Sequence, residues 1–415
     1  MTAPSFRDLF RVFGRIGVLS FGGPAAQIAL MHRELVEERS WLSEAVFLRA
    51  LSLCMLLPGP EAMQLATYAG WRLRGIGGGL VAGLLFVLPG AAVILVLALF
   101  YAVWGRVPLV QAAFLGIKSA VIVIVLQALL KLARRALGSR VAWALAGAAF
   151  LALFVFGLPF PLIVLVAGLL GAVVARPGTL PEPPSGARLS RSLPVLLFWG
   201  GLWLAPLPLL WVTNSAFLLQ LGLFFSKLAV VTFGGAYAVL AYMTQTVVTD
   251  HGWISTAQMI DALGLAETTP GPLILVTEFV ALLAGYLEGG FGLALVAGAL
   301  ALWVTFVPCF LWIFLAGPYL DAIAGRPRLS GALDAITAAV VGVILNLALW
   351  FGMHVLFAET RAVAGLPLTL PVVATLDIRA AALTVLAAGL MLGLRRSIGE
   401  TLLVMAVAGI LTSLI

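Results

Sequence analysis

Two cations in this 415-residue chain each stand five residues ahead of a hydroxyl side chain, and a pair of glycines follows each hydroxyl. The first set is Arg15, Ser20, Gly22 and Gly23, and the second set is Lys227, Thr232, Gly234 and Gly235. Arginine forks fit tetrahedral oxyanions, lysine acts as a point charge, and hydroxyls donate hydrogen bonds to the same oxygens. The pattern predicts an oxyanion-binding site. The alternative is that both cations extend towards lipid headgroups.

A second motif also occurs twice, as Pro58-Gly59-Pro60 and as Pro270-Gly271-Pro272, each time within an apolar segment. Proline removes a backbone donor and clashes with the preceding turn, so both motifs should interrupt a helix, as should the glycine pairs. An interrupted helix exposes a new N-terminus, whose unpaired N–H groups favour an anion. Paired breaks within membrane helices point to the substrate site of a transporter. The alternative is that they are packing kinks.

Polar side chains follow the first Pro-Gly-Pro motif at helical spacing. Glu61, Gln64, Tyr68 and Arg72 recur on one stripe of an otherwise apolar helix. A polar stripe within the membrane should face the protein interior or a cavity, so we expect Gln64 to bind substrate and Glu61 or Tyr68 to serve coupling or gating. The alternative is a short helix at the membrane interface whose polar ends reach water.

Carboxylates and hydroxyls flank the second Pro-Gly-Pro motif. Glu267, Thr268 and Thr269 precede it, and Glu278 follows it. We expect the two threonine hydroxyls to hydrogen-bond an oxyanion. An intramembrane carboxylate without a cationic neighbour suggests proton coupling, because burial favours its neutral form. The alternative is that Glu267 caps the broken helix or pairs with a base.

Two further titratable residues, His32 and Glu34, lie just beyond the first glycine pair. Their position suits a gate, and the alternative is a hydrogen bond within a loop. The three histidines have no metal-ligand spacing, and the sequence contains no nucleophile–base pair and no Walker loop. We therefore expect no metal, no cofactor and no enzymatic activity.

The elements that must position these residues are membrane helices. Hydrophobic residues make up 63% of the chain and charged residues 10%, against roughly 25% charged in soluble domains. Long apolar blocks exceed the roughly 20 residues of a spanning helix, and less regular segments bring the expected crossings to about ten to thirteen. The net charge of +7 comes from basic residues in short connections and lacks the aromatic interleaving of nucleic-acid sites. The blocks are Gly77–Trp104, Pro108–Leu130, Val141–Ala175, Leu193–Leu210, Gly290–Leu315, Gly331–Phe357, Ala380–Leu394 and Glu400–Ile415.

The chain is an internal duplication. A shift of 212 residues places 13–60 on 225–272 without a gap, and 18 of the 48 aligned positions are identical. The identities include the glycine pairs, the Pro-Gly-Pro motifs and a tryptophan, which chance matches of leucine and alanine do not give. Past the second motif the shift becomes 215. The predicted divisions are a first repeat at 1–175, a linker rich in proline and glycine at 176–192, and a second repeat at 193–415.

The two repeats differ in the charge of the stretch between their motifs. The first repeat carries Arg33, Arg39 and Arg49 there, and the matching stretch 245–261 contains no lysine or arginine. Basic residues favour the cytoplasmic side, so the two stretches should lie on opposite sides of the membrane. The predicted fold is therefore an all-α polytopic membrane protein with two homologous halves, an inverted repeat and broken helices.

At these motifs the sequence resembles the chromate ion transporter family in its long, two-domain form. The resemblance covers both halves in order. The stretches that carry it are Phe21-Gly22-Gly23-Pro24, Met31-His32-Arg33-Glu34, Pro58-Gly59-Pro60-Glu61-Ala62-Met63-Gln64, Thr232-Phe233-Gly234-Gly235 and Glu267-Thr268-Thr269-Pro270-Gly271-Pro272. It implies a secondary transporter of the bacterial inner membrane that exports chromate from the cytoplasm and confers resistance to it. It also implies recognition of sulfate, which is a similar tetrahedral dianion.

We therefore expect a transporter whose four helix breaks meet, bind a tetrahedral dianion and export chromate. The alternatives are a carrier of sulfate or another oxyanion, a channel and, in a different class, an intramembrane enzyme or lipid-handling protein. The expected partners are the oxyanion, the lipid bilayer and, in a homodimer, a second copy of the chain, without nucleic acid.

Overall fold

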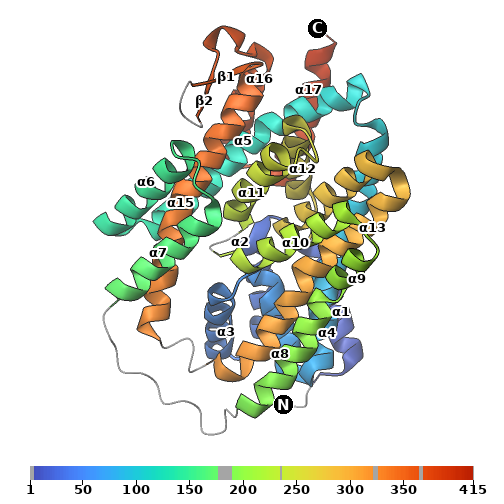
Figure 1. Ribbon diagram of the computed structural model, residues 1–415, viewed down its shortest axis with the longest axis vertical. Helices are drawn as coiled ribbons and strands as arrows, with labels where there is room; N and C mark the ends of the chain where they lie inside the picture. Colours follow the sequence, from blue (N-terminus) through green and yellow to red (C-terminus); the bar gives the residue numbers. More distant parts are fainter. Residues whose placement is uncertain (1–3, 176–188, 234–235, 321–325, 364–367, 415) are drawn as a thin grey trace. The chain divides into compact units, whose positions relative to one another are not determined.

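The computed structural model of the chain describes residues 4–175, 189–233, 236–320, 326–363 and 368–414. Helices make up most of this part of the chain, which confirms the predicted helical class (Figure 1). The first half contains α1 (Phe6–Leu19), α2 (Gly23–His32), the π-helical turn η1 (Arg33–Glu37), α3 (Glu44–Leu56), α4 (Glu61–Trp104), α5 (Pro108–Ala136), α6 (Arg140–Phe154) and α7 (Phe160–Val174).

The second half opens with two helices that lie ahead of 225–272, the segment aligned with the first half, and then continues in a similar order. Its elements are α8 (Leu189–Leu204), α9 (Pro206–Val212), α10 (Ala216–Val231), α11 (Ala236–Thr244), η2 (Gln245–Asp250), α12 (Thr256–Thr268), η3 (Leu273–Leu275), α13 (Val276–Ala316), η4 (Gly317–Tyr319), α15 (Pro327–Leu356), β1 (Thr360–Ala362), β2 (Thr369–Pro371), η5 (Val373–Thr375), α16 (Ile378–Ala388), η6 (Gly389–Gly393) and α17 (Ile398–Ser413).

The local structures of the two halves repeat at the predicted shift. A π-helical turn follows the short helix in each half, as η1 after α2 and as η2 after α11. Beyond each turn the backbone N–H of a tryptophan donates to the backbone carbonyl six residues earlier. The bond runs from Trp41 to Leu35 at 2.8 Å and from Trp253 to Val247 at 3.0 Å. The same hydrogen bond at aligned positions confirms that the halves are homologous.

The predicted helix breaks are present in the described chain. Helix α1 ends at Leu19 and α2 begins at Gly23, and between them Gly22 and Gly23 have φ angles of 86° and 76°. In the Pro-Gly-Pro motifs Gly59 and Gly271 have φ angles of 120° and 89°. These values lie in the left-handed region that glycine adopts without strain. Gly234 and Gly235, the second glycine pair, lie outside the described residues.

Each of the two longest helices also contains a sharp kink at aligned positions. In α4 the backbone leaves the helical region at Arg74 and Gly75, and in α13 it does so at Gly289 and Gly290, which are the same positions after the shift of 215. The apolar segments that were predicted to begin at Gly77 and Gly290 therefore start at these kinks. Each long helix consists of a short segment that begins at a Pro-Gly-Pro motif and a longer apolar segment.

Four helices of the described chain are long and apolar enough to cross a membrane: Glu61–Trp104, Pro108–Ala136, Leu273–Tyr319 and Pro327–Leu356. The bent pair Ser192–Leu204 and Pro206–Val212 adds one more if it is a single span, and five apolar helices are shorter, at 10–17 residues. A helix of 15 residues reaches only about 22 Å against a hydrocarbon core of about 30 Å, so length alone does not make these helices spans. The number of ten to thirteen crossings stays a prediction.

The chain forms two compact units, and each takes segments from both repeats. Unit 1 consists of Met1–Ala98, Ala175–Ala236 and Thr269–Ser330. Within it α8 and α10 pack against α13 (Figure 1). Gly17 of α1 lies against the backbone of Leu85 in α4, where a side chain would have no room. Unit 1 contains the glycine-pair and Pro-Gly-Pro positions that the structure describes.

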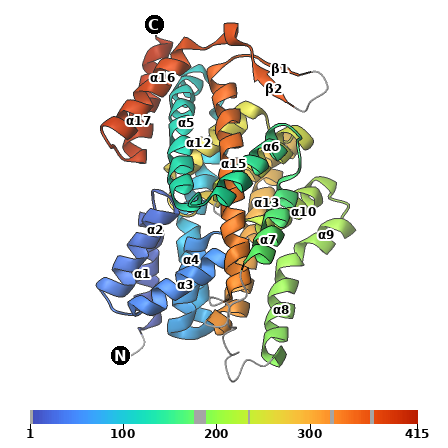
Figure 2. The same cartoon turned by 90° about the vertical axis from the view of Figure 1, so that its left-hand side faces the viewer.

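Unit 2 consists of Leu99–Val174, Tyr237–Thr268 and Gly331–Ile415. Its helix α5 packs against α16 and α17 (Figure 2), where Ala120, Val123, Leu383 and Met405 contribute to a buried apolar cluster. In the connection between α15 and α16, the strands β1 and β2 pair antiparallel. The sequence analysis did not predict this short hairpin, because segments of three residues have no periodicity to detect.

Candidate functional site

The break loops of the two repeats are joined by a reciprocal pair of backbone hydrogen bonds within unit 1. The N–H of Gly59 donates to the carbonyl of Thr232 at 2.9 Å, and the N–H of Gly271 donates to the carbonyl of Ser20 at 2.9 Å. The shift of 212 aligns Gly59 with Gly271 and Ser20 with Thr232, so the same bond is made twice with the halves exchanged. The described glycine-pair and Pro-Gly-Pro loops therefore meet.

A small pocket, called the break pocket below, lies where these loops meet. Its wall comes from the starts of three helices, and the free space is about that of one water molecule. The lining residues are Pro24 and Gln27 of α2, Gly59, Pro60, Glu61 and Ala62 at the start of α4, Thr232 after α10, and Pro272, Leu273 and Ile274 at the start of η3. The first N–H groups of a helix have no intrahelical acceptor, so the wall presents donors and a positive dipole end. This arrangement favours an anion.

Gln27 is a buried polar residue of the break pocket, and the sequence analysis did not single it out. Its side chain is 1% exposed, and Nε2 donates to the carbonyl oxygens of Gly271 at 2.7 Å and Ser20 at 3.2 Å. Its Oε1 has no hydrogen-bond partner among the described residues. The aligned residue in the second repeat is Val239, so a search for duplicated polar residues passes over Gln27. The signal for it was a lone amide one turn after Pro24 in an apolar segment.

Gln64, a predicted site residue, supports the first Pro-Gly-Pro loop. It is fully buried, and its Nε2 donates to the carbonyl of Pro58 at 2.6 Å. A Cβ added at Gly59 would lie 2.8 Å from that Nε2 and 3.1 Å from Cys309 Sγ. The loop therefore requires glycine both for its φ angle and for its closeness to these two side chains.

The hydroxyls ahead of the glycine pairs make equivalent bonds to their own helices. Ser20 Oγ donates to the carbonyl of Ile16 at 2.6 Å, and Thr232 Oγ1 donates to the carbonyl of Leu228 at 2.6 Å. Both residues are buried, and Thr232 lines the break pocket. Since each hydroxyl proton is already donated, these side chains offer a ligand lone pairs unless they rotate.

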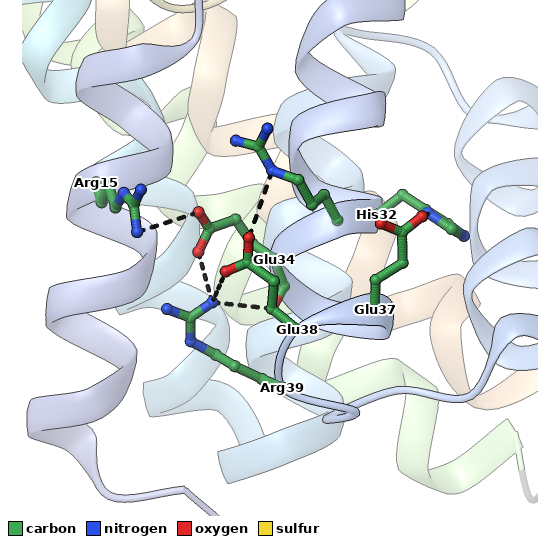
Figure 3. A network of polar contacts seen from close by, with 7 residues as sticks. Arg15, His32, Glu34, Glu37, Glu38 and Arg39 are labelled. Atoms are coloured by element: carbon green, nitrogen blue, oxygen red, sulfur yellow. Dashed lines mark hydrogen bonds and ion pairs between the residues drawn. The ribbon is translucent and has the colours of Figure 1, made fainter.

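The first predicted cation, Arg15, takes part in an ion-pair network (Figure 3). Its Nη1 lies 3.5 Å from Glu34 Oε1, and its side chain is 54% exposed. The Glu34 carboxylate is fully buried and accepts a hydrogen bond from Arg39 Nη1 at 2.6 Å. Lys227, the aligned cation, is exposed. Among the described residues that line the break pocket, neither Arg15 nor Lys227 is present.

His32 is the last residue of α2 and contacts two carboxylates. Its Nε2 lies 2.6 Å from Glu44 Oε2, and its Nδ1 lies 3.1 Å from Glu37 Oε1. The His32 ring also packs edge-on against Phe47. These contacts tie the short helix α2 to the start of α3.

The predicted coupling residues lie in different surroundings. Glu61 lines the break pocket, and Tyr68, about two turns further along the same stripe of α4, is buried. Glu278 of α13, also in unit 1, is 3% exposed, and its Oε2 has no hydrogen-bond partner among the described residues. In unit 2, Glu267 accepts a hydrogen bond from the Tyr237 hydroxyl at 2.8 Å.

The two predicted threonines are adjacent in the sequence but belong to different units. Thr268 belongs to unit 2, and its Oγ1 donates to the carbonyl of Leu265 at 2.7 Å. Thr269 begins a segment of unit 1 and is buried. Pro270 and Pro272 flank Gly271 in that segment, and Pro272 lines the break pocket.

A charged cluster around the buried carboxylate of Asp261 in unit 2 was not predicted. Lys118 Nζ of α5 lies 3.1 Å from Asp261 Oδ1 of α12, and the Tyr101 hydroxyl donates to Asp261 Oδ2 at 2.6 Å. The sequence does contain a signal for this cluster. Lys118 is a lone cation within the apolar block Pro108–Leu130, and an intramembrane charge usually has a partner or a function.

Within the described residues, no three His, Cys, Asp or Glu side chains are grouped as metal ligands would be. The two cysteines, Cys54 and Cys309, are both buried and free. The polar side chains that line the break pocket are Gln27, Glu61 and Thr232, and the helix starts add the backbone N–H donors that favour an anion.

Comparison with known proteins identifies the family. The sequence profile described as chromate transporter matches the chain twice, at residues 7–172 and 219–413, once in each half. A probable chromate transport protein of Synechococcus elongatus is 34% identical over 82% of this chain and 83% of its own length. The chromate transport protein of Cupriavidus metallidurans is 31% identical over 83% of this chain and 82% of its own length, and that of Pseudomonas aeruginosa is 33% identical over 82% and 79%.

No solved structure matches the chain. The two profile matches, the identities above 30% over most of the chain and the long apolar helices agree with one another. This chain is therefore a multi-pass membrane protein of the chromate transporter family, whose members are transporters and not enzymes.

Proposed function

We propose that this chain is a secondary transporter that exports chromate from the cytoplasm across a bacterial inner membrane, and that the anion binds in the break pocket. The reciprocal bonds from Gly59 to Thr232 and from Gly271 to Ser20 carry the proposal, because they bring breaks of both repeats to one pocket. The names of three similar proteins support chromate as the substrate.

The chemistry of the break pocket suits an oxyanion, but the pocket is too small to hold one in this structure. Helix starts supply N–H donors and a favourable dipole without an ionised side chain. A tetrahedral oxyanion has five heavy atoms, whereas the pocket has room for about one water molecule. Binding therefore requires the break loops to separate, which breaks one or both reciprocal hydrogen bonds. Alternating separation of the two loops is a route for the anion across the centre of an inverted repeat.

Export needs no coupling ion in energetic terms. Each negative charge that leaves a cell with a negative interior gains about 2.3 kcal/mol per 100 mV. The carboxylates Glu61, Glu267 and Glu278 are proposed coupling or gating groups, and coupling to protons would add to this driving force. The opposite orientation of the halves is part of the proposal and is supported by the arginines of 33–49 and their absence from 245–261.

Arg15 and Lys227 are proposed to attract the anion rather than to enclose it. Both side chains are exposed, and the Arg15 guanidinium is already shared with the buried carboxylate of Glu34. Charges in such positions raise the local concentration of an anion and its association rate. Ser20, Gln64 and Thr269 of unit 1 remain the proposed hydrogen-bonding residues of the site, and the role of Thr268, which belongs to unit 2, stays a prediction from the sequence.

The proposed function is tested by labelled chromate uptake into everted membrane vesicles. Vesicles that contain the chain should accumulate chromate above vesicles from cells with an empty vector, and a lumen-positive potential should increase the uptake. Competition by unlabelled sulfate or phosphate with the labelled chromate shows which other oxyanions bind the same site. Uptake equal to that of the empty-vector vesicles, with the protein present in the membrane, contradicts the proposal.

The role of the cations is tested in the same vesicles. Arg15→Ala and Lys227→Ala should each raise the chromate concentration needed for half-maximal uptake, and added salt should reduce the difference by screening. Arg379→Ala, which removes an exposed arginine of α16 in unit 2, is the matched control. Unchanged uptake in both variants would mean that the two cations serve only as anchors.

A further inference from the structure

Helix α1 runs alongside the apolar segment of α4 within unit 1 (Figure 2). Near the start of α1, the Phe6 ring lies 3.5 Å from the position that a Cβ would take at Gly77 of α4. Near the end of α1, Gly17 contacts the backbone of Leu85. Residue numbers rise in both helices from the first contact to the second, so the helices run in the same direction. The start of α1 therefore lies beside the kink of α4 at Gly75.

This kink is the turn of a helical hairpin. Gly70, in the short segment of α4, contacts the backbone of Gly78 in the apolar segment. A Cβ added at Gly79 would lie 3.1 Å from the carbonyl oxygen of Thr67. The two segments thus pack antiparallel, and the chain reverses at Gly75. A turn between two apolar helical segments should lie at a membrane surface, where water or headgroups can bind its backbone groups.

Exposed aromatic and aliphatic side chains surround the turn together with Arg74. Arg74 Nε donates to the carbonyl of Pro4 at 2.6 Å, and its guanidinium carbon lies 5.7 Å from the centre of the Phe6 ring. Phe6, Phe10 and Ile76 are 51%, 62% and 49% exposed. The start of α1 and the turn therefore form one surface that is partly apolar.

The same surface carries an excess of positive charge. Arg7 and Arg11 stand one turn apart on α1, and both are exposed, as is Arg74. The acidic residue of α1 is Asp8, whose carboxylate accepts a hydrogen bond from Ser5 Oγ at 2.6 Å in the capping box of the helix. Three arginines against one aspartate leave a net charge of +2. The surface made by Phe6, Arg7, Phe10, Arg11 and Arg74 is called the basic tip below.

The second repeat has the same kink without the arginines. The residues that align with Arg7, Arg11 and Arg74 are Leu219, Leu223 and Gly289. The backbone nevertheless leaves the helical region at Gly289 and Gly290, as it does at Arg74 and Gly75. The hairpin therefore does not require the arginines for its fold, which points to a ligand that contacts the first tip alone.

We propose that the basic tip binds the headgroup of an anionic phospholipid, with its arginines on the phosphate and its phenylalanines against the acyl chain. The arginine fork matches the geometry of a phosphate group, and basic residues at a membrane surface attract anionic lipids. Exposed phenylalanines next to the arginines suit the boundary between headgroups and acyl chains. Arginines that merely extend towards any headgroup would not distinguish an anionic from a zwitterionic lipid.

The inference is tested by lipid binding to the purified full chain in micelles of a neutral detergent. Energy transfer from the tryptophans of the chain to dansyl-labelled phosphatidylglycerol reports the bound lipid. Unlabelled phosphatidylglycerol should displace the label at a concentration about 10-fold to 30-fold lower than unlabelled phosphatidylcholine, since each arginine near a headgroup contributes about 5-fold. Sodium sulfate should displace the label no better than sodium chloride of equal ionic strength.

Two matched variants assign the preference to the basic tip. The double variant Arg7→Gln and Arg11→Gln keeps residues that favour a helix and should lose most of the preference for phosphatidylglycerol. Arg395→Gln with Arg396→Gln removes two exposed arginines of unit 2 that follow the exposed Leu394, and it should keep the preference. The unfolding temperature of each variant shows whether it is folded.

The unmodified chain alone can overturn the inference. Equal displacement by the two lipids contradicts an anionic-lipid site, and displacement by sulfate beyond that by chloride assigns the basic tip to a soluble oxyanion instead. An equal loss of preference in both double variants would show that basic charge anywhere on the surface is sufficient, which also contradicts it. Because the readout is lipid binding, none of these outcomes bears on chromate transport.

Discussion

Two buried glutamines support the break loops at the residue scale. Gln27 donates to the carbonyls of Gly271 and Ser20, and Gln64 donates to the carbonyl of Pro58. A neutral amide inside a membrane protein costs less to bury than an ionised side chain, and it can still satisfy carbonyls that a broken helix leaves without donors. The loops are thus held by neutral side chains.

Gly59 is the position of the first Pro-Gly-Pro loop at which a larger side chain should be least tolerated. Gly59→Ala would place a methyl group 2.8 Å from Gln64 Nε2 and 3.1 Å from Cys309 Sγ, at a φ of 120°. We expect the variant to lose about 1–3 kcal/mol of stability and most of its chromate uptake. Thermal unfolding in detergent and vesicle uptake measure the two effects. Gly14→Ala in α1, where a Cβ meets no atom within 4 Å, is the control, and equal behaviour of the two variants would falsify the assignment.

At the scale of elements, the duplication made the helix breaks predictable. Motifs that recur at one shift distinguish paired breaks from scattered glycine and proline, and the breaks at Gly22, Gly59 and Gly271 are where the sequence predicts them. The kinks at Gly75 and Gly290 follow the same alignment. A repeat is a strong signal because two independent segments must share the same local structure.

The contacts that complete the site were not predictable in the same way. Gln27 has Val239 as its aligned residue, so symmetry gives no sign of it. Lys118 and Asp261 are 143 residues apart, and their pairing depends on the packing of α5 against α12. The ion pair between Arg15 and Glu34, at 3.5 Å, was not predicted, and the role of Arg15 at the substrate stays a prediction. Pairings of this kind arise from tertiary structure, which sequence spacing does not encode.

The cluster of Lys118, Asp261 and Tyr101 should tie α5 to α12 through a buried ion pair. Removing one partner leaves a buried charge uncompensated, so Lys118→Met and Asp261→Asn should each destabilise the protein by about 3–5 kcal/mol. The double variant should lose less than the sum of the two, because no charge is left unpaired. Thermal unfolding of all four proteins gives the coupling energy. Additive losses would show that the pair does not hold the helices together.

At the scale of the whole molecule, the two sequence repeats and the two compact units are different divisions of the chain. Each unit takes segments from both repeats, and unit 1 collects the described breaks of both. The boundaries at 1–175 and 193–415 come from the duplication in the sequence, and they stay a prediction. A site that needs both repeats cannot be complete in one of them alone.

The proposed inversion of the repeats has a direct test by cysteine labelling. Ser40→Cys and Thr249→Cys place exposed thiols in the aligned connections of the first and second repeat. The native Cys54 and Cys309 are buried, so they should give little background. A membrane-impermeant maleimide should label the two positions from opposite sides, as compared between intact cells and everted vesicles. Labelling of both from the same side contradicts an inverted repeat.

The central claim is that the broken helices of both repeats form one oxyanion site. A structure determined with bound chromate, using the anomalous scattering of chromium, tests it most directly. We predict a chromium peak between the starts of α2, α4 and η3, with chromate oxygens facing the N–H groups at Glu61 and Leu273. A chromium peak beside Arg15 or Lys227, with none in the break pocket, would contradict the account.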